Sequence, residues 1–122
     1  MNLRLHLAES GADTERLDQV TRYLREELLE LDVHAVTALP SGPPPPGSRA
    51  LDVATVGGLL VTLGQSATAL QTIVAAVQNW LRRGTPVPRA VRVEIDGDVL
   101  ELSDATGEEQ ERLVALFVGR HA

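Results

Sequence analysis

The chain has 122 residues, of which 43% are hydrophobic, and it contains no cysteine. This size predicts a single domain over residues 1–122, and the missing thiols exclude disulfides and thiolate metal sites. All 11 basic residues are arginine against 17 acidic residues, giving a net charge of -6. Because phosphate backbones attract basic surfaces, this charge argues against a nucleic-acid partner.

The N-terminal part of the chain is typical of a strand, a helix and a second strand. Leucines alternate with polar residues over residues 3–7, which predicts a strand rather than a secretory signal. Apolar residues at helical spacing then predict an amphipathic helix that Asp13 or Thr14 caps and that ends near residue 31. Residues 33–39 predict a second strand.

Prolines and glycines divide the middle of the chain. We expect a surface loop over residues 40–49, because proline has no amide hydrogen and a fixed φ. Residues 51–83 have a helical pattern, with a break expected near Gly57 and Gly58 or near Gly64.

The segment 53–81 carries no charged residue and is long enough to cross a bilayer. Its amides, hydroxyls and glycines argue against a membrane span, because each polar group in lipid needs a partner. We therefore expect an ordinary helix with Ser66 as its candidate N-cap. Membrane docking through residues 51–81 is the alternative.

Residues 91–95 and 99–102 flank Asp96 and Gly97, a composition that predicts a β-hairpin with a type I′ turn. A two-residue loop fixes the pairing across the hairpin. The expected pairs are Ile95 with Asp98, Val93 with Leu100, Val91 with Leu102, Arg92 with Glu101 and Glu94 with Val99.

Thr106 and Glu109 predict a capping box at the start of a last helix. Its expected buried residues are Leu113, Val114, Leu116 and Phe117. These elements predict an α+β fold with a four-stranded mixed, mostly antiparallel sheet and helices mainly on one face, in the order β-α-β-(proline loop)-α-α-β-β-α. The first two strands either are adjacent or flank a strand of the hairpin.

No pattern in the sequence predicts catalysis. The histidines His6, His34 and His121 lack a neighbouring nucleophile motif. Asp96 and Asp98 belong to a hairpin too short for a calcium loop, and no phosphate-binding lysine follows the glycines. We therefore expect no enzyme, no catalytic residue, no cofactor and no metal.

The uncharged helix offers more apolar surface than a core of this size needs, and extended apolar surface usually finds a partner. We expect it to dock on another protein or on a second copy of the chain. The expected partner-interface residues are Leu70, Ile73, Val77, Trp80, Leu81, Arg82 and Arg83.

Several pieces of the sequence occur together in one order. They are the opening Leu-Arg-Leu-His-Leu strand, Tyr23-Leu24-Arg25, the proline-rich loop, Gly57-Gly58-Leu59-Leu60, the uncharged helix ending in Trp80-Leu81-Arg82-Arg83, and the valine-rich hairpin. In this combination nearly the whole chain resembles the effector-associated constant component family, first class, of actinobacteria and other multicellular bacteria.

The resemblance implies a small non-catalytic partner encoded beside variable effectors, such as caspase-like or trypsin-like peptidases, in predicted conflict or antiphage systems. It implies a cytoplasmic adaptor that holds or regulates an effector protein encoded nearby. Only Trp80, Leu81, Arg82 and Arg83 carry over as positions that match the pattern of the family.

Overall fold

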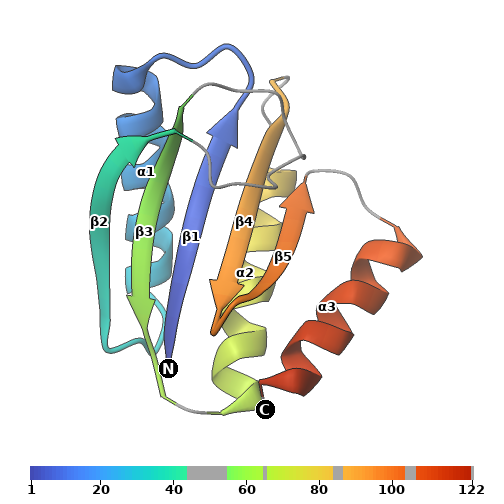
Figure 1. The fold of residues 1–122 in the computed structure, drawn as a ribbon. Helices are drawn as coiled ribbons and strands as arrows, with labels where there is room; N and C mark the ends of the chain where they lie inside the picture. The colour runs from blue at the N-terminus through green and yellow to red at the C-terminus, as the bar shows by residue number, and fades with distance from the viewer. Residues whose placement is uncertain (44–54, 65, 84–86, 104–106, 122) are drawn as a thin grey trace.

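The computed structural model describes residues 1–43, 55–64, 66–83, 87–103 and 107–121. These residues form five strands and three helices around one sheet (Figure 1). The elements are β1 (Asn2–Glu9), α1 (Thr14–Leu29), β2 (Ala35–Gly42), β3 (Val56–Thr62), α2 (Ala67–Arg82), β4 (Arg89–Ile95), β5 (Asp98–Ser103) and α3 (Glu108–Arg120).

The sheet has the order β2-β3-β1-β4-β5, and every neighbouring pair is antiparallel. Helices α1 and α2 lie behind the sheet in Figure 1, and α3 lies beside α2 at the β5 end. The α+β class and the one-sided packing are therefore confirmed. The prediction of a four-stranded mixed sheet was wrong, because the sheet has five strands and is antiparallel throughout. Strands β1 and β2 are separated by β3, which neither expected strand order contains.

The fifth strand is β3, where the sequence predicts helical structure broken at the glycines. Strand β3 pairs with β1 on one side and β2 on the other. A Cβ at Gly57 would overlap the Thr21 hydroxyl of α1, so glycine lets that helix approach the sheet. Residues 56–61 are all apolar, and β3 is an inner strand of the sheet.

The expected helix over 51–81 is thus a strand followed by α2, which has 16 residues. Among the residues that the structure describes, no helix combines the length and apolar character that crossing a membrane requires. Residues 51–54 and most of the proline-rich segment lie outside the described ranges. The expected loop does not begin at Pro40, because β2 continues to Gly42, and an edge strand tolerates proline.

Both predicted caps of the longer helices are confirmed. Asp13 caps α1 by accepting a hydrogen bond from the Arg16 amide at 2.8 Å, and Ser66 caps α2 by accepting one from Ala69 at 3.0 Å. Helix α1 ends at Leu29, two residues before the predicted position.

The hairpin of β4 and β5 has every predicted pair, from Ile95 opposite Asp98 to Val91 opposite Leu102. Its turn has φ of 49° at Asp96 and 86° at Gly97, as a type I′ turn requires. This element is local in sequence, so side-chain alternation and turn composition suffice to predict it.

Helix α3 departs from its predicted burial. Only Phe117 is buried, while Leu113 is 48% and Leu116 is 53% exposed. The N-cap is Gly107 and makes no side-chain cap bond, and Thr106 lies outside the described residues. The helix packs on α2 and β5 at the end of the helical layer, so its apolar residues are only partly covered.

Candidate binding site between two helices

The residues expected to meet a partner divide into two groups. Leu70, Ile73, Val77, Trp80 and Leu81 are at most 6% exposed and belong to the core of the chain itself. The expectation that the apolar face of α2 is an interface conflicts with this burial, because the face packs in the core. Arg82 and Arg83 are exposed at the C-terminal end of α2.

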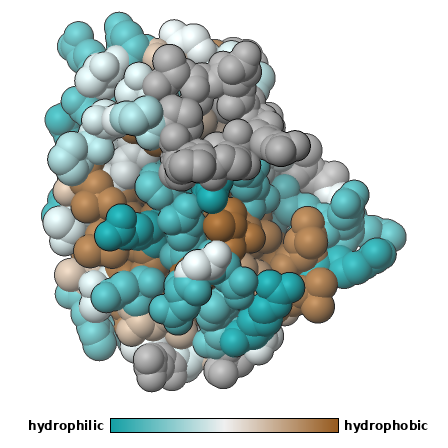
Figure 2. Space-filling model, in the orientation of Figure 1, coloured by the Kyte–Doolittle hydropathy of each residue, from teal (hydrophilic) through white to brown (hydrophobic). Residues whose placement is uncertain are grey.

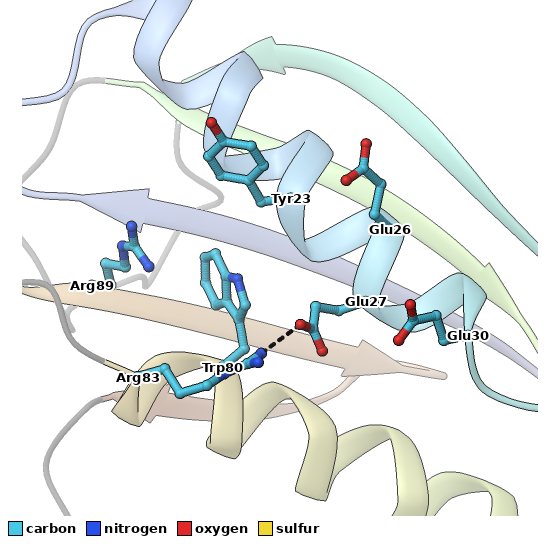
Figure 3. Close-up of a pocket in the computed structure, with 7 residues that line it drawn as sticks. All are labelled: Tyr23, Glu26, Glu27, Glu30, Trp80, Arg83 and Arg89. Atoms are coloured by element: carbon cyan, nitrogen blue, oxygen red, sulfur yellow. Dashed lines mark ion pairs between the residues drawn. The ribbon is translucent and has the colours of Figure 1, made fainter.

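A pocket of about 440 Å³ lies where this end of α2 approaches α1 (Figure 3). We call it the α1–α2 pocket. It is lined by Tyr23, Glu26 and Glu27 of α1, Glu30 at the C-cap of α1, Trp80 of α2, Arg83 at the C-cap of α2 and Arg89 of β4. It therefore contains two of the seven predicted interface residues.

Helical spacing explains how α1 supplies one wall of the α1–α2 pocket. Tyr23, Glu27 and Glu30 recur at i, i+4 and i+7, which places them along one flank of the helix. They lie beside the buried stripe that contains Leu24 and Leu28. The flank faces α2 because that stripe packs on the sheet.

The charges of the α1–α2 pocket are only partly paired. Arg83 Nη2 lies 2.8 Å from Glu27 Oε1, an ion pair that joins the two helices across the pocket. The side chains of Glu26 and Glu30 are exposed and form no ion pair or hydrogen bond with any described residue. Two carboxylates thus remain available at the rim.

Behind the α1–α2 pocket, Glu9 is 4% exposed and accepts hydrogen bonds from Arg16 Nε at 2.9 Å and Arg89 Nε at 3.1 Å. Burial raises the pKa of Glu9, but the hydrogen bonds and charges of the two arginines outweigh it and hold the pKa below its ordinary value. The guanidinium carbon of Arg89 lies 4.7 Å from the centre of the Trp80 ring. Arg89 is therefore neutralised by Glu9 and fixes one face of the tryptophan.

Trp80 is 6% exposed, and its indole nitrogen donates to no described residue. Figure 3 shows this nitrogen on the side of the ring that faces Glu27. Among the described residues, Thr21 Oγ1 is the only fully enclosed side-chain polar atom without a partner, so the indole nitrogen is open to the pocket. The indole N–H is therefore a polar group of the α1–α2 pocket that a ligand can satisfy.

The histidines considered in the sequence analysis do not gather into one site. His6 pairs with Gly58 in the sheet, whereas the His34 amide donates to Thr62 at the other end of β3. His6 Nε2 lies 3.7 Å from Glu94 Oε2 on the helix-free face of the sheet. Burial lowers the pKa of His6 more than Glu94 raises it, so His6 is neutral at pH 7.

Of the two aspartates of the hairpin, Asp98 pairs with side chains at the end of α3. Asp98 Oδ2 lies 2.9 Å from His121 Nε2, and its other oxygen lies 3.4 Å from Arg120 Nη1. Asp96 is exposed in the turn. Within the described ranges, no three His, Asp or Glu side chains gather closely enough to hold a metal ion.

The sequence reasoning missed most of the α1–α2 pocket. Tyr23, Glu26 and Glu30 look like an ordinary solvated face, and only tertiary packing shows which flank meets α2. The inward orientation of Glu9 and Arg89 could have been predicted from the alternation of side chains along their strands. Glu9 continues the inward alternation of β1 after Leu7, and Arg89 precedes Val91 of β4 on the inward side.

Comparisons of this chain with family models, with curated proteins and with solved structures find no match.

Proposed function

We propose that this protein is a non-catalytic interaction module whose α1–α2 pocket binds a basic side chain of a partner protein. The observation that carries the proposal is the meeting, in one pocket, of two unpaired carboxylates with an indole N–H that donates to no described residue. Carboxylates with aromatic neighbours attract cations. A hydrogen bond from this N–H to a ligand carbonyl would contribute about 1 kcal/mol.

An arginine or lysine residue of a partner supplies both complementary groups. Its cation would lie near Glu26 and Glu30, beside the exposed ring of Tyr23. A main-chain carbonyl close to that side chain would accept the Trp80 N–H. The pair between Glu27 and Arg83 narrows the pocket and gives the ligand guanidinium or ammonium a polar wall.

The resemblance to effector-associated components supports an effector, such as a peptidase encoded nearby, as the partner in a bacterial conflict or antiphage system. By the same resemblance, we propose that the complex forms in the cytoplasm. Docking is proposed at the end of α2 rather than along its apolar face, because that face lies in the core.

Trp80 is the single tryptophan of the chain, so its fluorescence reports directly on the α1–α2 pocket. We expect tri-arginine peptide to change the Trp80 emission and tri-glutamate peptide to leave it unchanged. Replacing Glu26→Arg and Glu30→Arg together should weaken tri-arginine binding about tenfold or more, because repulsion replaces attraction. The matched control is Glu108→Arg with Glu111→Arg, which changes the net charge equally at exposed positions of α3.

The second test is a pull-down of the proteins encoded by neighbouring genes. The wild type and the α3 control should retain an effector that the Glu26→Arg/Glu30→Arg variant releases. An effector that binds both variants equally would remove the α1–α2 pocket from the proposal. Failure of every neighbouring product to bind the wild type would count against the effector partnership itself.

A further inference from the structure

Four residues of α3 form a stripe along the exposed side of the helix. Glu109, Leu113, Leu116 and Arg120 recur at i, i+4, i+7 and i+11, which places them along one line of a helix with 3.6 residues per turn. Leu113 is 48% and Leu116 is 53% exposed, and the side chain of Arg120 is 61% exposed. We call this set the α3 stripe.

The α3 stripe is accessible in the folded chain. Phe117 and the half-buried Val114 face inward, next to the stripe rather than within it. Figure 2 shows hydrophobic surface on the side of the molecule where α3 lies, beside the hydrophilic N-terminal end of that helix. Along the α3 stripe, Leu113 and Leu116 lie between Glu109 and Arg120.

We propose that the α3 stripe pairs with the α3 stripe of a second copy of this chain, with the two helices antiparallel. A two-fold axis midway between Leu113 and Leu116 brings each Leu113 against Leu116 of the second copy. The same register places Glu109 beside Arg120 of the second copy. Apolar contacts and opposite charges are thus satisfied together at both ends of the helix pair.

Charge selects this orientation over the parallel one. The first turn of α3 contains Glu108, Glu109 and Glu111, and its last turn contains Arg120. Parallel pairing would place Glu109 against Glu109, whereas antiparallel pairing also aligns the helix dipoles favourably. Arg120 Nη1 lies 3.4 Å from Asp98, and a guanidinium has five N–H donors, so Arg120 can serve a second carboxylate as well.

The contact is small, since a helix of 13 residues is about 20 Å long. Interfaces of this size belong to transient complexes, and we expect a dissociation constant of about 10 μM or weaker. The inference is independent of the α1–α2 pocket, which lies between other helices. Its failure leaves the proposed function unchanged, and the reverse also holds.

Sedimentation velocity over a range of concentrations tests the pairing. Glu109→Arg alone and Arg120→Glu alone should each weaken the dimer about three- to tenfold, because each creates a like-charge pair. The double variant restores opposite charges and should recover most of the affinity. Glu108→Arg is the control, since it lies in the same turn but outside the α3 stripe, and far-UV circular dichroism checks that every variant stays folded.

The chain has no cysteine, so cross-linking can read the register. Under oxidising conditions, a mixture of the Leu113→Cys and Leu116→Cys proteins should form the mixed disulfide in excess of its random share. An excess of the two self-linked disulfides would show parallel pairing and overturn the proposal. A chain that stays monomeric at every concentration, or a double charge variant that fails to recover affinity, would also overturn it.

Discussion

Helices α2 and α3 both carry apolar residues at helical spacing, but the fold covers them to very different extents. The buried residues of α2 are Leu70, Ile73, Val74, Val77, Trp80 and Leu81, and none is more than 6% exposed. Helix α3 leaves Leu113 and Leu116 about half exposed. The difference follows from position, since α2 packs between α1 and α3 whereas α3 closes the layer.

A helix without charged residues, such as the middle of α2, therefore need not offer an exposed surface. The middle of α2 has no charge because small and uncharged polar residues cover its outer side, while its apolar side fills the core. Helix α3 is rich in charge but keeps apolar residues next to solvent. Neighbouring elements, rather than composition, decide which helix can offer surface to another molecule.

The largest effect that tests this comparison comes from placing the same charge on each helix. Val77→Asp buries an unpaired carboxylate, and we expect it to cost about 4 kcal/mol or more and to abolish cooperative unfolding. Leu116→Asp should change the free energy of unfolding by about 0.5 kcal/mol or less, because the side chain already contacts water. Urea unfolding followed by far-UV circular dichroism measures both. Equal losses in the two variants would show that α3 is covered as completely as α2.

Substitutions of Glu9 test whether its ion pair with Arg89 stabilises the C-terminal end of α2. Glu9→Gln removes the charge that neutralises Arg89, which lies over Trp80, and breaking such a buried pair costs about 3 kcal/mol. Arg16→Gln should cost less, since the Arg16 side chain is 39% exposed.

The folded-state pKa of Glu9 lies below its ordinary value of 4.5, so the unfolded chain binds the proton more readily. The stabilisation by Glu9 is therefore complete above that value and is lost as the pH falls through the lower folded-state pKa. Urea unfolding at a series of pH values should show a smaller loss below pH 4.5 for Glu9→Gln than for the wild type. Equal slopes would mean that other carboxylates carry the acid sensitivity.

The sequence predicts local elements of this fold well and non-local ones poorly. Strand β1 and the hairpin at Asp96 follow from alternation and turn composition, which act between neighbours in the chain. Strand β3 was missed because its partners, β1 and β2, lie far away in sequence, and an apolar run with glycines has no period that identifies a strand.

The residues of the candidate site also divide into those that local sequence predicts and those that depend on packing. Trp80 and Arg83 were singled out because they end a recognisable helix, and the structure places both in the α1–α2 pocket. Glu26 and Glu30 were not, because the side of α1 that meets α2 depends on how both helices pack on the sheet. The exposure of Leu113 was missed for the same reason, since a stripe of apolar residues does not reveal whether a neighbour covers it.

A smaller loss of stability than for Val77→Asp or Glu9→Gln is expected at the contact between α1 and β3. Gly57→Ala would force its new methyl against the Thr21 hydroxyl, and overpacking of this kind costs about 2 kcal/mol. Thr21→Ala removes the obstructing atom, a buried hydroxyl with no hydrogen-bond partner among the described residues. The double variant should therefore be more stable than the sum of the single losses predicts, by about 1 kcal/mol in a double-mutant cycle of urea unfolding. Gly64→Ala is the control, since nothing lies within 4 Å of its added Cβ. Additive losses would mean that α1 shifts as a whole instead of being held at Gly57, and the helical layer would then be adjustable at α1 as well as at its α3 end.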